Sequence, residues 1–306
     1  MAKEYVKQHI VPKRYLERFT FKNEYGAPVV GVVLKNTKGI KPFTRSIKDV
    51  GYEKNIYDVE DKNDPKYWEH FLDREFDILC GSKLQNIIAR INLTGSNYKL
   101  NSDEIDTLTK LMLSQAFRVP ESINYIEQIY KEELAPFTDW YISKFPKNQK
   151  QEIKKVLSGI NYSNQWKKQV YLNAVFDKKG FEEKCDIIRN RVWIIYYNNI
   201  SDKIPFCTSD NPVLIESLKN ENTGLFNNGL ASPTTLLYFP ITPKIAVVNY
   251  PKEMFFGIET EFTGRLYFLN EEKYIITKNE KIVGNAFKHA FIPQPTFNEL
   301  IELWNH

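Results

Sequence analysis

Side chains that can transfer protons or hold phosphate gather near the start of the chain, where His9, Lys13, Arg14 and Tyr15 surround Pro12. An imidazole has an ordinary pKa near ~6.5, which suits proton transfer at neutral pH, and the two cations suit phosphate binding. Pro12 fits the first turn of a helix, where its missing N–H leaves no hydrogen bond unmade. The segment therefore predicts a short helix with His9 held just before it. The alternative interpretation is an ordinary helix start with an incidental histidine.

Glu75 is a carboxylate in an unexpected place. Helical spacing gives it one face in common with four apolar residues, Trp68, Phe71, Leu72 and Leu79. A carboxylate within an apolar stripe is costly to bury unless it is paired or binds a metal. We therefore predict that Glu75 is buried, either in a functional site or in a structural ion pair with Arg118.

Gln115 and Arg118 repeat this pattern on the next helix, where they follow Leu108 and Leu111 at helical spacing. Their polar groups are thus expected to point the same way as the apolar residues. A guanidinium in such a position can hold phosphate or carboxylate with two parallel hydrogen bonds. The alternative is structural, because Arg118 stands where Pro120 interrupts the helix and a cation is favoured at a helix C-terminus.

A Ser-Asp-Asn-Pro turn, residues 209–212, directly follows a predicted strand. Loops at strand ends often carry catalytic groups, so Asp210 is a candidate catalytic residue and Ser209 and Asn211 are candidate substrate contacts. Asp and Asn before Pro also form turns through bonds to their own backbone, which is the structural alternative. Ser209 is not in a Gly-x-Ser-x-Gly elbow, which argues against a serine hydrolase.

The elements that must position these residues change type along the chain. Strands are predicted at 28–36, 55–59, 192–197, 204–208, 236–239 and 244–249, from their β-branched and aromatic content. Helices are predicted at 65–91, from 101 to Pro120, and at 123–141, 148–158, 164–176, 271–277 and 298–304. This order predicts an α+β fold in which N- and C-terminal strands form a mixed or antiparallel sheet and a helical bundle is inserted between them. We expect a single domain with an N-terminal strand region 1–63, a helical insert 64–188 and a strand-rich region 189–306.

Composition narrows the class of protein. The chain has 306 residues, 42% of them hydrophobic, and a mean hydropathy of -0.45, with no apolar run near the ~20 residues needed to span a bilayer. The three cysteines are far apart, which argues against a disulfide framework or zinc site and favours the cytoplasm. The net charge of +4 and pI of 8.6 are too mild for a dedicated duplex-DNA binder.

Several of these segments resemble, in order, a bacterial and phage family known only as domain of unknown function four-two-three-eight. The matching motifs are His-x-Val-Pro-x-x-Tyr-Leu at 9–16, Glu75 in its helix, Gln-x-x-Arg-x-Pro at 115–120, Ser-Asp-Asn-Pro at 209–212 and Pro-x-x-Pro at 240–243. The resemblance spans nearly the whole chain. It implies candidate positions without an established reaction, and an occurrence in phage and bacterial genomes.

We hypothesise that His9, Glu75, Arg118 and Asp210 converge on one catalytic site. Histidine or glutamate would act as the base and arginine would hold the phosphate, while carboxylates would bind Mg²⁺ or Mn²⁺ if the reaction uses a metal. Substrate contacts are assigned to Lys13, Arg14, Tyr15, Gln115, Ser209 and Asn211. The expected function is a nuclease in phage defence or toxicity, with nucleic acid as partner. The alternative is a non-catalytic protein that binds a ligand or another protein and in which the same residues form a structural network.

Overall fold

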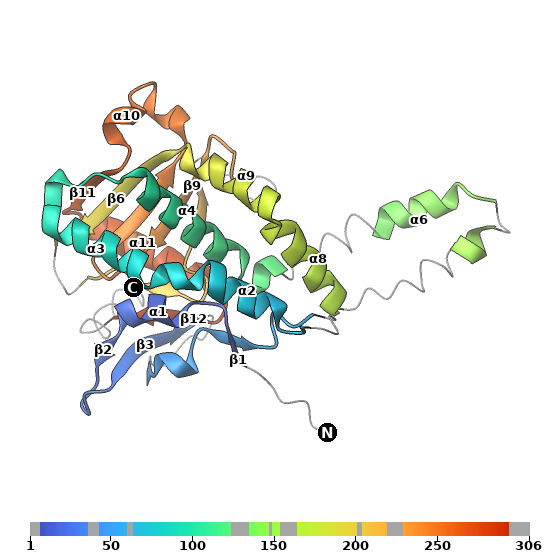
Figure 1. Cartoon of the computed structure of the whole chain (residues 1–306), viewed down its shortest axis with the longest axis horizontal. Coiled ribbons are helices and arrows are strands. Elements are labelled where there is room, and N and C mark those ends of the chain that lie inside the picture. Colours follow the sequence, from blue (N-terminus) through green and yellow to red (C-terminus); the bar gives the residue numbers. More distant parts are fainter. Residues whose placement is uncertain are drawn as a thin grey trace.

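The computed structural model describes residues 7–35, 43–59, 64–123, 135–146, 149–153, 164–200, 204–218 and 229–293. It has an α+β fold, as the sequence predicts, with a larger sheet, a smaller sheet and helices between them in the chain (Figure 1). One large apolar core contains residues from the N-terminal segment, the helices and the C-terminal strands. None of the described helices is both long enough and apolar enough to cross a bilayer.

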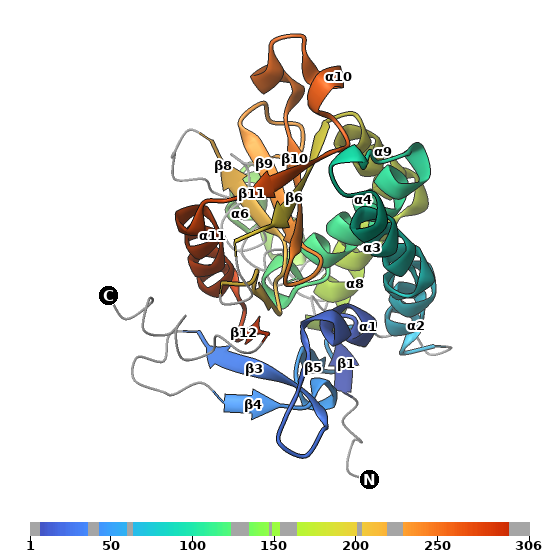
Figure 2. The same cartoon turned by 90° about the vertical axis from the view of Figure 1, so that its left-hand side faces the viewer.

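The larger sheet is built from C-terminal strands. Its order is β11 (Arg265–Leu269), β6 (Val192–Asn198), β10 (Ile245–Tyr250), β9 (Thr235–Pro240) and β8 (Leu214–Ser217). All neighbours are antiparallel except β11 and β6. Neighbouring residues of β10 alternate between two cores: Val247 packs with the large core, whereas Val248 packs with residues of α11 (Glu272–Asn285). Figure 2 shows this sheet with α11 on one side and α3, α4 and α9 on the other.

The smaller sheet joins the two ends of the described chain. Its order is β2 (Phe21–Lys22), β3 (Pro28–Leu34), β12 (His289–Ile292) and β7 (Thr208–Ser209), and β4 (Phe43–Arg45) also pairs with β3. Antiparallel pairing aligns Val32 of β3 with Phe291 of β12. The expectation that N- and C-terminal strands share a sheet is thereby confirmed, although the larger sheet consists of C-terminal strands alone.

Two strand predictions were wrong. Residues 55–59 form no strand, and the nearby strand is β5 (Tyr52–Lys54), which pairs with β1 (Lys7–His9). Asn55 adopts a positive φ of 52°, which ends the extended run at that point. Of the predicted strand 204–208, only Thr208 lies in a strand, and Asn279 binds the N–H of Cys207 in place of a strand partner.

The helices follow the predicted order, with one important break. The helix predicted over 65–91 is three pieces: α2 (Tyr67–Glu75), a 3₁₀ turn (Asp77–Cys80) and α3 (Ser82–Thr94). The next helix, α4 (Ser102–Phe117), begins with a reciprocal capping box between Asn101 and Glu104 and ends before Pro120, as expected. The other described helical segments between α4 and β6 are residues 120–123, α6 (Ala135–Ser143), residues 149–153, α8 (Asn164–Phe176) and α9 (Lys178–Arg189). Predicted helix segments at 124–134, 154–158 and 298–304 lie outside the described residues.

Candidate functional site

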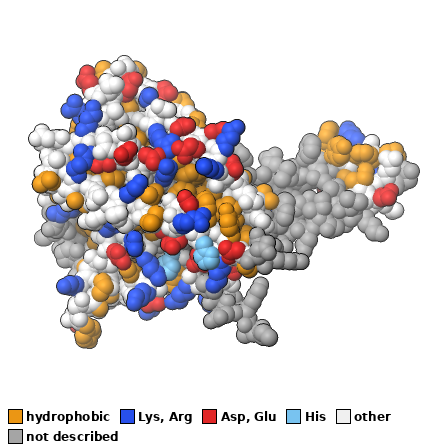
Figure 3. Space-filling view, in the orientation of Figure 1, with side chains coloured by type: hydrophobic (Ala, Val, Ile, Leu, Met, Phe, Trp, Pro, Cys, Tyr) orange, Lys and Arg blue, Asp and Glu red, His pale blue; other side chains and the backbone are white. Residues whose placement is uncertain are grey.

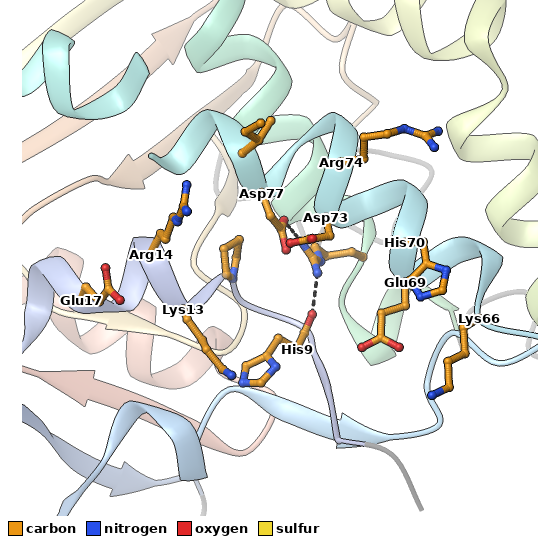
Figure 4. Close-up of a pocket in the computed structure, with 13 residues that line it drawn as sticks. His9, Lys13, Arg14, Glu17, Lys66, Glu69, His70, Asp73, Arg74 and Asp77 are labelled. Carbon is orange, nitrogen blue, oxygen red and sulfur yellow. Dashed lines mark hydrogen bonds and ion pairs between the residues drawn. The ribbon is translucent and has the colours of Figure 1, made fainter. Parts of the chain in front are cut away.

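A cleft of about 860 Å³ opens between α1 (Lys13–Leu16) and α2, and we call it the α1–α2 cleft. Figure 4 shows the side chains that line it, and Figure 3 shows histidine, acidic and basic groups side by side on this face. Its polar lining residues are His9, Lys13, Arg14, Glu17, Lys66, Glu69, His70, Asp73, Arg74, Asp77 and Arg118. Predicted site residues His9, Lys13, Arg14 and Arg118 thus share one cleft.

His9 ends strand β1 and lies at the edge of this cleft, as Figure 4 shows. Its ring is 6.1 Å from the ring of its cross-strand neighbour Tyr52. Burial, followed by the charges of Lys13 and Arg118, lowers the pKa of His9 from 6.5 to about 4. The imidazole is therefore neutral at pH 7, and its Nε2 atom is buried without a hydrogen-bond partner among the described residues.

Gln8 fixes the strand that carries His9, although its polar neighbours in the sequence gave no sign of burial. Its side chain is fully buried and its Nε2 donates to Asp58 at 2.7 Å and to Glu69 at 3.1 Å. Its Oε1 accepts the N–H of Tyr57 at 2.7 Å. Because Gln8 and His9 point to opposite sides of β1, anchoring Gln8 directs His9 outward.

Arg118 holds the same strand from beneath the cleft. It is 2% exposed, donates to the backbone carbonyl of His9 and pairs with Asp77, while its Nε lies 3.2 Å from the hydroxyl of Tyr57. Burial alone would lower the pKa of Arg118, but the charge of Asp77, the Tyr57 hydroxyl and the hydrogen bonds to both together outweigh it and raise the pKa. The guanidinium that was predicted to hold a phosphate or carboxylate of a ligand therefore already bonds to groups of the protein itself.

The prediction that Glu75 is buried and pairs with Arg118 is wrong. The Glu75 side chain is 47% exposed, bonds to Arg74 and does not line the α1–α2 cleft. The cause is the end of α2 at Glu75: Phe76 leaves helical geometry with φ -121° and ψ -44°. The break turns Phe76 and Asp77 toward the interior, so the buried carboxylate stands two positions after the predicted one.

Asp210 directly follows β7, beside the start of β12, and is not among the residues that line the α1–α2 cleft. Its carboxylate is 1% exposed and accepts the N–H groups of Phe287, Lys288 and His289 at 2.6 to 2.8 Å. The adjoining Ser209 hydroxyl bonds to the backbone of Asn211. The Asn211 side chain donates to Asn285 at the end of α11. These groups therefore hold the structure, but Asp210 and Asn211 bond to a distant segment and not to their own backbone as the structural alternative expected.

Tyr15 and Gln115, two predicted substrate contacts, are both buried. The hydroxyl of Tyr15 lies 2.7 Å from the Thr208 hydroxyl and donates to the carbonyl of Pro240, and its ring stacks on Phe239. Tyr15 thereby links α1 to both sheets. Gln115 is 1% exposed, and its amide has no hydrogen-bond partner among the described residues.

Replacing Tyr15 with Phe should lower the free energy of unfolding by about 1–3 kcal/mol, because the Thr208 hydroxyl and the Pro240 carbonyl would stay buried without this partner. Urea unfolding followed by circular dichroism measures the change. Tyr25→Phe is the matched control. Because Tyr25 is 84% exposed, this variant should unfold at the same urea concentration as the wild type. Equal midpoints for the two variants would show that the Tyr15 hydroxyl contributes nothing.

Arg14 illustrates how closely the cleft wall is packed. A Cβ atom added to Gly81 would lie 2.7 Å from the Nη1 atom of Arg14, so glycine leaves room for the guanidinium there. On the opposite wall, the carboxylates of Glu69 and Asp73 lie one helical turn apart on α2, and that of Asp77 follows the break after α2. Within the described ranges, however, His, Cys, Asp and Glu residues form no group of three that could hold a metal ion. Glu75 and Asp210, the carboxylates expected to bind a metal if the reaction uses one, do not line this cleft.

Comparisons with known proteins identify one family. A sequence model described as "Protein of unknown function (DUF4238)" matches residues 7–293. No curated protein and no solved structure matches the chain.

Proposed function

We propose, from the premise that the chain belongs to the DUF4238 family, that its α1–α2 cleft hydrolyses phosphodiester bonds of nucleic acid in a defence or toxin role. The observation that supports this function best is the imidazole of His9. It is neutral, its Nε2 atom has no hydrogen-bond partner in the described part of the chain, and it stands beside Lys13 at the edge of an open polar cleft. A neutral imidazole is a proton acceptor, and a neighbouring cation attracts a phosphodiester anion.

In the proposed reaction, Lys13 and Arg14 hold a phosphodiester at the edge of α1. His9 accepts a proton from the attacking water as its oxygen bonds to phosphorus, and the bond from phosphorus to the leaving oxygen breaks. The leaving oxygen is protonated by solvent or by the His9 imidazolium. A bound phosphate also offsets the positive charge of Lys13, one cause of the low pKa of His9, and so makes the imidazole a stronger base.

The direct test is incubation of the purified protein with RNA, single-stranded DNA and duplex DNA, each with and without Mg²⁺ or Mn²⁺. We expect at least one substrate to be cleaved by the wild type. In bacterial cells, induced expression of the wild type should slow growth more than expression of His9→Ala at the same protein level. Failure to cleave any of the three substrates would reject the nuclease function.

The low pKa of His9 sets the expected pH profile. Because the imidazole accepts a proton only when neutral, kcat/KM should be constant from pH 7 to about 5 and fall as pH approaches the pKa of about 4. Initial rates on a fluorescent oligonucleotide give the profile, with circular dichroism at each pH as the control for folding. That control matters because a folded pKa below 6.5 means that stability is lost as pH falls from 6.5 toward 4. If kcat/KM fell to half its plateau near pH 6.5, the ordinary pKa of histidine, the buried and positively charged surroundings of His9 would not be lowering its pKa.

A second candidate function is non-catalytic binding of an anionic or mixed-charge ligand in the same cleft. Two observations favour it. Arg118 and Asp77 are paired with each other, and the cleft is lined by five basic and four acidic side chains, which is no strongly basic groove. A binding protein would retain a labelled oligonucleotide without cleaving it, and His9→Ala would leave that retention unchanged.

A further inference from the structure

A second cleft of about 660 Å³ lies against the smaller sheet, bounded by β3, β4, β5 and the start of β12. Figure 2 shows these strands below the larger sheet. It shares none of its lining residues with the α1–α2 cleft. Its volume lies within the ~300–1,000 Å³ typical of small-molecule sites.

The register of the sheet places a mixed apolar and cationic surface in the second cleft. Val32 is paired with Phe43 of β4 and with Phe291 of β12. Since side chains two apart along a strand share a face, Arg45 lies on the same face as Phe43, and His289 on the same face as Phe291. An apolar floor is thus flanked by a guanidinium and an imidazole.

Asp210 orients the imidazole of His289. Its Oδ2 atom lies 3.6 Å from the Nδ1 atom of His289, and three backbone N–H groups hold the carboxylate in place. A carboxylate beside Nδ1 favours the proton on that nitrogen and leaves Nε2 at the outer edge of the ring. The His289 side chain is 29% exposed and lines the second cleft, so a ligand can reach it.

The charges in the second cleft leave one guanidinium without an ion pair. The carboxylates of Asp49 and Glu53 are paired with Lys7 and Lys288. The guanidinium of Arg45 lies 5.2 Å from the centre of the Phe43 ring, and no acidic partner for it occurs among the described residues. The guanidinium of Arg45 therefore presents donors to an anion, and the Nε2 atom of His289 can accept the proton of a phosphate monoester monoanion, whereas the acidic groups of this cleft are already neutralised.

We propose that the second cleft binds a nucleoside monophosphate. The phosphate is held by Arg45 and His289, and the base lies against the partly exposed ring of Phe43. This goes beyond the proposed hydrolysis, because it uses none of the residues assigned to that reaction. It also gives Asp210 a second role, as the positioning residue for His289.

Histidine NMR tests the proposal on the whole chain, which has four histidines whose C2–H signals single substitutions can assign. Titration with AMP should shift the signal of His289 and leave His70 in the α1–α2 cleft unshifted. Arg45→Ala and His289→Gln should each weaken AMP binding about tenfold. Lys48→Ala removes a nearby exposed charge that does not line the cleft, and it should bind AMP like the wild type.

Inorganic phosphate and adenosine are the two comparison ligands, and each should bind more weakly than AMP. Phosphate binding as tightly as AMP would overturn the nucleotide assignment. So would an AMP titration that shifts no histidine, or that shifts His9 in place of His289. Unchanged AMP affinity in both Arg45→Ala and His289→Gln would place the ligand elsewhere. Because these readouts do not depend on cleavage, they are independent of the test of nuclease activity.

Discussion

Replacing His9 with Ala is expected to lower the rate of nucleic-acid cleavage by about 10²–10⁴-fold, the usual contribution of a general base. The variant should still fold, because Arg118 donates a hydrogen bond to the backbone carbonyl of His9 and alanine has the same carbonyl. The lost ring contact with Tyr52 should cost about 1 kcal/mol. Initial rates under substrate excess, combined with urea unfolding of the same samples, measure both effects.

The matched control is His70→Ala in the same cleft. The His70 side chain is 64% exposed and contacts Asp64, so its removal should change cleavage little. Wild-type cleavage by His9→Ala would exclude His9 as the base. Loss of cleavage together with a large loss of stability would mean that the His9 side chain serves the fold and not the reaction.

Replacing Arg118 with Ala is expected to lower the free energy of unfolding by about 3–5 kcal/mol, because Asp77 would keep a buried charge without its partner. The Tyr57 hydroxyl and the His9 carbonyl would each lose a hydrogen bond as well. The midpoint of urea unfolding, with its slope compared to that of the wild type, gives the change.

Two further variants separate the ion pair from other effects. Glu75→Gln should unfold like the wild type, since Glu75 is exposed and its ion pair is with its sequence neighbour Arg74. Arg118→Ala combined with Asp77→Asn should recover part of the lost stability, because the uncompensated charge is removed. An unchanged midpoint for Arg118→Ala would contradict the buried pair.

The fold class followed from local patterns because many elements carry their own signals. The strand at 28–34 is β-branched, and the helix from Ser102 begins with a capping box that the sequence displays. That N- and C-terminal strands share a sheet also followed from the order of strands and helices, although the strand at 289–292 that pairs with β3 was not predicted. The separate C-terminal sheet did not, because its register depends on contacts between distant segments.

The candidate site was predicted less well than the fold, for two physical reasons. Helical spacing places Glu75 on a buried face only if the helix continues, and the break at Phe76 gives that role to Asp77. Buried polar residues also have two uses that spacing cannot separate: Asp210 satisfies three backbone N–H groups, whereas His9 keeps an unpartnered nitrogen. Gln8 was overlooked because its burial depends on Asp58, Glu69 and Tyr57, all far along the chain.

Two long-range contacts affect how the protein can fold during its synthesis. They are the hydrogen bonds of Tyr15 with Thr208 and Pro240, and the pairing of β3 with β12. A ribosome makes the N-terminal segment first, yet that segment cannot dock until strands more than 190 residues later have emerged. At ~5–20 residues per second, translation from residue 7 to residue 292 takes roughly a quarter of a minute to a minute. The cleft around His9 is therefore completed late. Under the proposed nuclease function, this delay would separate translation of the protein from its activity.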